Sequence, residues 1–347
     1  METNMEQGML DLLIRPGFYV QNHTIVYANQ AAQALLLPPG MDIRELLLTG
    51  QEEYASFREG CLYLQLNIAG GCGASVFPME DRYLFLLDQE SDDDALRAMA
   101  LAARELRQPL TAMQMSVQQL SEEGQDSEQV ARLNRGIHQM LRIIGNMSDA
   151  GRSTESFHPE LRDIPQVISG ILDRVQLLAS HTGTTLQYQC SSDSVLGLVD
   201  EQLLERAVLN LLSNAVKFSP AGSTIDVQLN RNGRMLMLSI TDHGSGIADN
   251  LRQTLFHRYL RQPGIEDGRF GLGLGMVMIR SAAARHGGTV LIDRPGETGT
   301  RVTITLPIRQ DTSGLRSPVL RVDYSGEQDH GLVELADCLP LSAYYKE

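Results

Sequence analysis

Short apolar runs alternate with turn signals over the first 88 residues of the chain. The stretch GFYVQNHTIVYANQAAQALL contains two strand-like runs joined by a turn at Gln21, Asn22 and His23, followed by a helix of small residues. Three more strand-like runs follow in CLYLQLNIAGGCGASVFPMEDRYLFLLD, where Gly and Asp separate them. This pattern predicts a small α+β module over residues 1–88.

The next region has the hydrophobic spacing of a helical hairpin. From residue 96 the apolar positions alternate between spacings of three and four, which is typical of a helix with one narrow seam. The seam positions are Leu96, Met99, Ala103, Leu106, Leu110, Met113, Val117 and Leu120, and after the polar stretch SEEGQDSE they continue at Val130, Leu133, Ile137, Met140, Ile144 and Met147. We therefore expect two antiparallel helices over residues 92–150. Because one hairpin alone leaves part of its seam exposed, we expect two chains to form a four-helix bundle.

A polar linker precedes a third region, in which helical and strand-like patterns are mixed. The patterns predict a helix over 164–179, a strand over 184–190, a helix over about 200–217 and a hairpin that turns at Arg231, Asn232 and Gly233. A further strand-turn-strand pattern covers 289–308. We interpret residues 158–309 as an α/β sandwich domain and leave the tail, residues 310–347, unassigned. The fold class is thus a multidomain α+β protein.

Charge and composition exclude several classes of partner. The 347 residues carry 29 Lys and Arg against 43 Asp and Glu, a formal net charge of −14. This charge disfavours nucleic acid and anionic membrane surfaces as partners. The sequence shows neither an apolar run of membrane-spanning length nor the charged and apolar start of a secretory signal, so we expect a cytoplasmic protein. The four cysteines are scattered, which fits neither a zinc site nor a disulfide framework.

Two patterns in the third region have a chemical reason to contact a nucleotide. Asn210, Asn214 and Lys217 share one face of a predicted helix, and carboxamide oxygens beside an ammonium group suit a magnesium-bound triphosphate. Asp242 ends an apolar strand, and its carboxylate can accept a hydrogen bond from the amine of an adenine. Gly244 and Gly246 follow it and allow the backbone to approach a flat ring.

Two further patterns follow along the chain. Arg258 and Arg261 lie in the amphipathic stretch LFHRYLR, and Gly271, Gly273 and Gly275 come just before a predicted helix, where unpaired N–H groups bind anions. Taken singly, such a glycine cluster is more often a flexible turn, and paired asparagines are more often a solvated helix face. The order of the four patterns carries the argument.

NLLSNAVKF, DHGSGI, LFHRYLR and GLGLG closely resemble the N, G1, F and G2 boxes of the ATP-binding domain of sensor histidine kinases, which has the Bergerat fold. The resemblance covers about residues 92–308. It implies that Asn214 coordinates Mg²⁺, that Asn210 and Lys217 face the phosphates of ATP, and that Asp242 binds the adenine amine. It also implies that Gly244 and Gly246 shape the adenine pocket. The same resemblance places Gly271, Gly273 and Gly275 at a mobile lid over ATP and gives Arg258 the arginine position of the F box, beside the transferring phosphoryl group.

The first helix of the hairpin resembles the H box of the same family. In LAARELRQPLTAM, Arg104 occupies the position of the phosphoacceptor histidine, while the residues around it match the box. A guanidinium stays protonated and offers only hydrogen-bond donors, so Arg104 cannot attack phosphorus. We expect Arg104, Glu105 and Gln108 to point outward from the seam.

The other histidines do not replace the missing one. His138 lies in the second hairpin helix, His158 in the linker and His286 in the third region. We interpret each as an ordinary surface or capping histidine.

These observations favour a dimeric signal-transduction protein that binds ATP and Mg²⁺ without autophosphorylation at the H box, which makes it a pseudokinase at that step. It would phosphorylate a partner kinase in a mixed dimer or regulate the receiver domain of a response regulator. One alternative is a non-catalytic scaffold that ATP regulates. Another is a phosphatase that uses Glu105 and Gln108 to position water, against which a merely solvated helix face is the simpler interpretation. A Bergerat-fold ATPase is disfavoured because Asn210 stands where such enzymes place a glutamate base.

The N-terminal module also has a resemblance. Its order of elements, with Asn29 directly after the second strand, resembles a PAS domain. An unrelated α+β dimerisation module is the alternative.

Overall fold

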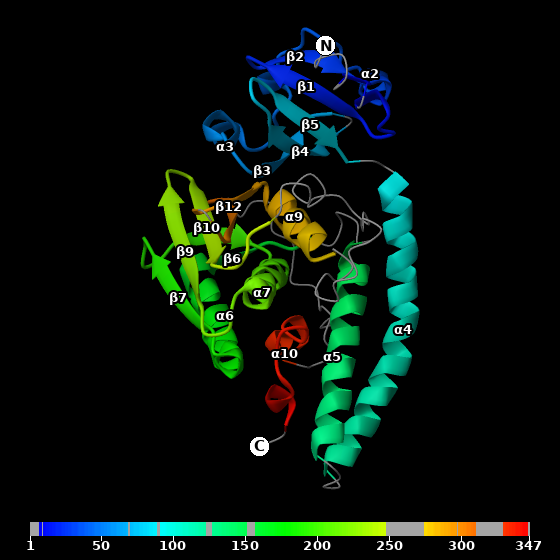
Figure 1. Cartoon of the computed structure of the whole chain (residues 1–347), viewed down its shortest axis with the longest axis vertical. Coiled ribbons are helices and arrows are strands. Elements are labelled where there is room, and N and C mark those ends of the chain that lie inside the picture. The colour runs from blue at the N-terminus through cyan, green and yellow to red at the C-terminus, as the bar shows by residue number, and fades with distance from the viewer. Residues whose placement is uncertain are drawn as a thin grey trace.

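The computed structural model describes residues 7–8, 10–68, 70–88, 91–122, 127–150, 157–247, 274–296, 298–309 and 329–345. Ten strands form one sheet in the order β2-β1-β5-β4-β3-β11-β12-β10-β9-β7. Long helices lie beside this sheet, and a two-helix hairpin forms one flank of the molecule (Figure 1). The chain is therefore a mixed α+β protein, as the sequence predicts.

The N-terminal module contributes five antiparallel strands and two short helices. Its elements are β1 (Gly17–Gln21), β2 (Thr24–Ala28), α2 (Gln30–Ala34), α3 (Gln51–Ser56), β3 (Cys61–Leu66), β4 (Cys72–Pro78) and β5 (Tyr83–Leu87), with a short 3₁₀ helix at Ile43–Glu45. Asn22 and His23 have φ angles of 49° and 65°, and Gln21 pairs with Thr24. These angles match a two-residue hairpin turn, so the predicted turn is confirmed. The PAS resemblance stays a prediction.

Asn29 holds the start of the module together. Its side chain is 1% exposed, and its Oδ1 accepts hydrogen bonds from the backbone N–H groups of Ala32 (3.0 Å) and Gly17 (3.1 Å). Its amide donates to the carbonyl oxygens of Leu10 (3.1 Å) and Arg15 (2.8 Å). Asn29 thus caps α2 and ties the preceding segment to it.

The predicted hairpin consists of α4 (Ser91–Glu122) and α5 (Ser127–Ala150), which contact each other along their length. Ala103, Leu110 and Val117 of the predicted seam are buried, whereas Leu106 and Met113 are 49% and 50% exposed. The predicted seam is therefore only partly buried within one chain. The reason is geometric, because a single neighbouring helix covers only one side of a seam that is two residue rows wide.

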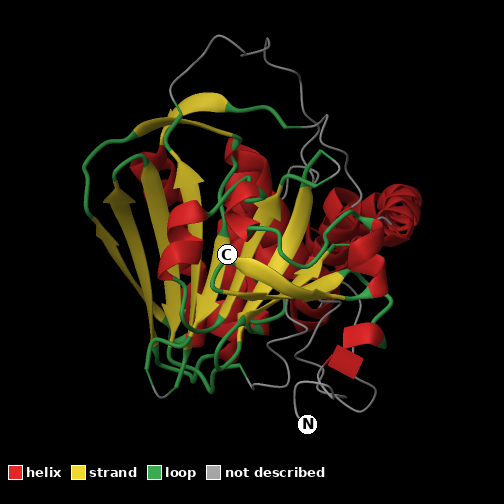
Figure 2. Cartoon of the chain, turned by 90° about the horizontal axis from the view of Figure 1, so that it is seen from above, coloured by secondary structure: helices red, strands yellow, loops and turns green. Residues whose placement is uncertain are grey.

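The C-terminal α/β domain packs its helices onto one face of the sheet. Its elements are β6 (Glu160–Asp163), α6 (Ile164–Ala179), β7 (Thr185–Cys190), β8 (Leu196–Val199), α7 (Glu201–Phe218), β9 (Thr224–Asn232), β10 (Met235–Asp242), α9 (Leu274–His286), β11 (Val290–Asp293) and β12 (Thr300–Pro307). Seen from above, the strands form a layer with helices packed against it (Figure 2). The predicted turn of the β9–β10 hairpin is shifted, since β9 continues through Asn232 and pairs it with Met235. Gly233, at φ 58°, and Arg234 make the turn instead.

The two modules share their sheet, which the sequence patterns did not predict. Strand β3 pairs antiparallel with β11, with Tyr63 opposite Val290. The Arg280 guanidinium of α9 lies 3.0 Å from Oδ1 of Asp88 and 4.7 Å from the centre of the Tyr63 ring. A backbone ladder and one buried cation thus join the N-terminal module to the α/β domain.

The C-terminal segment, which the sequence left unassigned, packs back onto the molecule. It contains α10 (His330–Glu334) and a 3₁₀ helix at Leu341–Tyr344. Contacts run from α10 to α5, α6 and α7, so the segment lies between the hairpin and the α/β domain (Figure 1). None of the helices described here has the length and apolarity that crossing a membrane requires.

Candidate functional site

Helix α7 carries the first group of predicted site residues. Asp200 caps the helix, its Oδ1 accepting a hydrogen bond from the backbone N–H of Leu203 (3.2 Å). Asn210 is fully buried, whereas Asn214 and Lys217 are half-buried. The predicted spacing on one helix face is present.

Asp242 lies at the end of β10, where the sheet meets the helical layer. Its Oδ1 accepts hydrogen bonds from the backbone N–H groups of Gly244 (2.9 Å) and Thr300 (3.2 Å), which fix the orientation of the carboxylate. The side chain is 8% exposed, and burial raises the pKa of Asp242 although both hydrogen bonds lower it. Sequence reasoning missed Thr300. The signal lay in the strand pattern of 289–308, because the pairing of β12 with β10 places Thr300 opposite Asp242.

The two glycines after Asp242 bring three segments close together. A Cβ on Gly244 would lie 2.3 Å from the carbonyl oxygen of Phe218, at the end of α7. Gly246 has φ 74°, and a Cβ there would lie 3.0 Å from the carbonyl oxygen of Gly299. Both positions require glycine, so the loop is held against the end of α7 and the start of β12.

Gly275 connects the glycine-rich motif to α7. It lies in the first turn of α9, where a Cβ would be 3.0 Å from Oδ1 of Asn210. This Oδ1 is buried and has no hydrogen-bond partner among the described residues. Gly271, Gly273 and Arg258 lie outside the described residues, so their predicted places stay untested.

His286 joins α9 to the beginning of α7. Its Nδ1 donates to the carbonyl oxygen of Ala282 (2.7 Å), and its Nε2 accepts from the backbone N–H of Asp200 (3.0 Å). Burial lowers the pKa of His286, so the ring is neutral with its proton on Nδ1. The histidine is buried, so of the predicted alternatives, a surface or a capping histidine, the surface position is wrong.

His138 is also buried, at 5% exposure, against the same expectation. Its Nδ1 donates to the carbonyl oxygen of Asn134 (2.7 Å), and its ring centre lies 5.2 Å from that of Tyr344 in the C-terminal segment. The sequence could not show that Tyr344 packs against His138, because the two residues are far apart along the chain.

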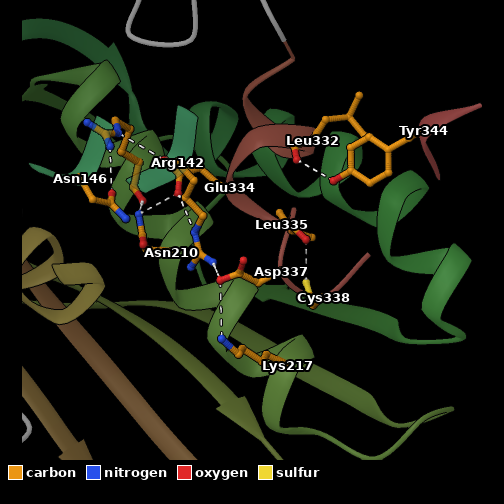
Figure 3. Close-up of polar contacts among 11 residues, drawn as sticks. Arg142, Asn146, Asn210, Lys217, Leu332, Glu334, Leu335, Asp337, Cys338 and Tyr344 are labelled. Atoms are coloured by element: carbon orange, nitrogen blue, oxygen red, sulfur yellow. Dashed lines mark hydrogen bonds and ion pairs between the residues drawn. The ribbon is translucent and has the colours of Figure 1, made fainter. Parts of the chain in front are cut away.

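Two carboxylates of the C-terminal segment contact the α7 residues (Figure 3). Oε2 of Glu334 accepts from Nδ2 of Asn210 (3.3 Å), and Oδ2 of Asp337 lies 3.6 Å from Nζ of Lys217. Arg142 of α5 pairs with both carboxylates. The α7 face that the sequence analysis predicts to contact phosphates therefore binds two carboxylates of the same chain.

The H-box positions lie elsewhere. Arg104, Glu105 and Gln108 are exposed on α4, and α5 lies between α4 and the α/β domain (Figure 1). Within one chain the structure brings Asn210, Lys217, Gly275 and the loop after Asp242 into one region and leaves the H-box residues outside it.

Comparison with known domain families gives two matches in separate parts of the chain. Residues 95–156 match the His Kinase A (phospho-acceptor) domain. Residues 199–310 match the domain described as histidine kinase-, DNA gyrase B-, and HSP90-like ATPase. The first match covers the hairpin and the second covers α7 through β12.

Curated relatives are sensor kinases. The chain is 26% identical over 242 residues to the sensor protein KdpD of Clostridium acetobutylicum, covering 65% of this chain but only 27% of KdpD. It is 28% identical to the adaptive-response sensory kinase SasA of Synechococcus sp., covering 71% of this chain and 70% of SasA. For the sensor-like histidine kinase SenX3 of Mycobacterium tuberculosis the identity is 28%, over 80% of this chain and 70% of SenX3.

Among solved structures, full-length ShkA in complex with AMPPNP has a similar fold. The TM-score is 0.51 at 21% identity, over 63% of this chain and 47% of ShkA.

Proposed function

The chain belongs to the sensor histidine kinase family, and from that premise we propose that it binds ATP with Mg²⁺ but does not autophosphorylate at its H box. The observation that carries this proposal is the exposed Arg104 on α4, in a chain whose ATPase-like domain holds an oriented Asp242 and the α7 face. A protonated guanidinium has no lone pair to offer phosphorus.

The described residues suit the nucleotide. The fixed carboxylate of Asp242 is placed to accept from the adenine amine, and Gly244 and Gly246 keep side chains away from the ring. Lys217 and Asn210 already bind carboxylate oxygens, so they fit the oxygens of a phosphate chain equally well. ATP would supply the phosphoryl group, and Mg²⁺, for which the resemblance proposes Asn214 as ligand, would offset its charge. Arg258, Gly271 and Gly273 enter the proposal on the resemblance alone.

Incubation with ATP labelled on its γ-phosphate tests the proposal. We expect the wild-type chain to bind ATP and to carry no acid-labile label on the peptide that contains Arg104. The variant Arg104→His should gain such label, whereas Arg104→Gln, which has no nucleophilic nitrogen, should not. Acid-labile label on a histidine of the wild-type hairpin, or failure to bind ATP, would refute the proposal.

Phosphorylation of a partner is the first possible output. In a mixed dimer the nucleotide site of this chain would face the hairpin of another kinase. We expect the chain to transfer label to a partner kinase whose own ATP-binding domain has been inactivated. Tight ATP binding with no transfer to any candidate partner would exclude this output and leave the scaffold function, in which ATP only changes the conformation.

A phosphatase acting on a receiver domain is the second possible output. The observation in its favour is that Glu105 and Gln108 are both exposed on α4, where a docked receiver domain can reach them. A carboxamide orients water without titrating. If Gln108→Ala dephosphorylates a regulator as fast as the wild type does, this output is excluded.

Dimerisation would bury the exposed apolar side chains of the hairpin. Besides Leu106 and Met113, the large apolar side chains that are exposed among the described residues of the two helices are Leu101, Met115, Leu133, Met140 and Ile143. Leu106 and Met113, like Leu133 and Met140, are seven residues apart and so share a helix face that a second copy would cover, and this agrees with the matched His Kinase A domain. The N-terminal module is the proposed input domain.

A further inference from the structure

Residues 329–345, here called the tail segment, form a folded unit on the surface of α5 and α7. The Asp329 side chain caps α10 by accepting from the N–H of Leu332 (3.0 Å), and the hydroxyl of Tyr344 donates to the carbonyl of Leu332 (3.1 Å). Leu335 and Leu339 are buried in the core of the α/β domain. The segment is therefore docked with a defined shape.

Glu334 is the most buried charge of the tail segment, with 0% exposure. Its carboxylate meets Nδ2 of Asn210 at 3.3 Å, Nε of Arg206 at 3.4 Å and Nε of Arg142 at 3.5 Å. A carboxylate without exposure needs such partners, because burial of an unpaired charge is costly. These partners come from α7 and from α5.

Asp337 makes the second link, further along α7. Its Oδ2 lies 3.6 Å from Nζ of Lys217 and also bonds Arg142 (Figure 3). The Asp337 carboxylate therefore contacts both α7 and α5. The two carboxylates lie along the α7 face that we propose contacts the phosphates of ATP.

We propose that the tail segment is an internal competitor of ATP that occupies the phosphate side of the nucleotide site, an inference that rests on the proposed function. The carboxylates of Glu334 and Asp337 stand where phosphate oxygens would bind Asn210 and Lys217. Triphosphate and carboxylates cannot share these donors, because like charges a few ångströms apart repel strongly in a partly buried site. ATP binding therefore requires the tail segment to leave.

Release of the tail segment would also remove links between α5 and the α/β domain. Arg142 of α5 pairs with Glu334 and Asp337, whereas Asn146 of α5 bonds Arg206 of α7 directly. The docked state therefore adds the Arg142 links to the direct contacts between the hairpin and the domain that would carry ATP, in addition to blocking the site.

Covalent attachment makes this competition effective. The tail segment is joined to β12 through residues 310–328, so its local concentration at the site is on the order of millimolar. The apparent Kd for ATP is then the intrinsic Kd divided by the fraction of molecules with an undocked tail.

Affinity measurements on the full chain test the proposal. Asp337→Asn keeps the shape of the side chain and removes its charge, and Tyr344→Ala loosens the tail segment without touching α7. We expect each variant to lower the apparent Kd for ATP·Mg by about tenfold, the effect of a modest shift in the docking equilibrium. Asp173→Asn, at an exposed aspartate of α6, is the matched control and should leave the Kd unchanged.

The outcomes separate the two proposals. If the wild type and both variants bind ATP·Mg with the same Kd, or if the variants bind more weakly, the tail segment is not a competitor, while the proposed function stands. If none of the proteins binds ATP·Mg at millimolar concentration, the proposed function fails and the competition fails with it.

A cross-link gives the converse measurement. Cys338 of the tail segment lies beside the buried Ser213 of α7, whose hydroxyl is among the groups that lower the pKa of the thiol while burial raises it to about 11. Ser213→Cys would place a second thiol next to Cys338. We expect oxidation, with the bond between the introduced thiol and Cys338 verified by peptide mass spectrometry, to abolish ATP binding and dithiothreitol to restore it. Unchanged ATP binding with the bond formed would overturn the proposal.

Discussion

Asp242 combines a proposed binding role with a cost in stability. Burial raises its pKa, so at neutral pH the charged carboxylate is less favourable in the folded protein than in the unfolded chain. Asp242→Asn keeps an oxygen that accepts from Gly244 and removes the charge. We therefore expect the melting temperature to be unchanged or higher, while ATP binding, followed by calorimetry, is lost.

The reverse pattern would contradict this assignment of Asp242. A variant that unfolds at lower temperature and still binds ATP would show that the carboxylate is structural and takes no part in nucleotide recognition.

The burial of His286 predicts that the stability of the protein depends on pH. Its folded pKa is lowered from the ordinary 6.5 by burial, with Arg309 and Arg285 acting in the same direction and Asp200 opposing. Well above pH 6.5 the ring is neutral in both the folded and the unfolded state and contributes no pH dependence. As the pH falls below that value, His286 binds a proton in the unfolded chain but not in the folded chain. The free energy of unfolding therefore decreases.

Urea denaturation at pH 7.5 and pH 5.5 measures this effect. In His286→Gln we expect a smaller loss of stability between the two pH values than in the wild type, and some loss should remain because burial also lowers the pKa of His138. His181→Gln, at an exposed histidine, is the control. An equal loss in His286→Gln and wild type would show that His286 is not the titrating group.

At the scale of elements, the exposed rows of the hairpin predict dimerisation. Leu106→Glu and Met113→Glu place charges on the half-exposed seam, where a second hairpin would bury them. We expect light scattering to give a dimer for the wild type and mostly monomer for the double variant. Leu177→Glu, at a leucine of α6 that is 72% exposed, should remain dimeric. A monomeric wild type at micromolar concentration would contradict the expectation.

Helices and strands could be predicted from hydrophobic periodicity, because that periodicity depends on residues that are close together in the sequence. The hairpin, α6 and the strands around Asp242 all lie close to their predicted positions. The contacts of Glu334 with Asn210, and of β3 with β11, could not be predicted in this way. They join segments that are remote in sequence, and the sequence DYSGEQDHGLVELAD carries no period strong enough to indicate what it covers.

At the scale of the molecule, the junction between the N-terminal module and the α/β domain predicts that the stability of each depends on the other. Arg280, 3% exposed, pairs with Asp88 and stacks on Tyr63. Arg280→Met should lower the free energy of unfolding by about 2 kcal/mol, since it leaves Asp88 without this partner. We also expect faster amide hydrogen exchange in β11.

An exposed ion pair provides the comparison for this measurement. Arg301→Met removes the pair with Asp293, but the Arg301 side chain is 42% exposed, so the change should be well under about 1 kcal/mol. Equal effects of the two substitutions would show that Arg280 does not hold the modules together.

The antiparallel ladder between β3 and β11 also limits how motion can pass through the molecule. Two paired strands cannot slide by a fraction of a residue, and a slip of one residue would turn Leu62 and Leu291 to the wrong faces. Through this ladder, a displacement of the first five strands can therefore reach the α/β domain as a twist of the whole sheet or as a parting of the two strands, beside what passes through the pair of Arg280 with Asp88. A displacement too small to part the two strands therefore turns β3 and β11 together.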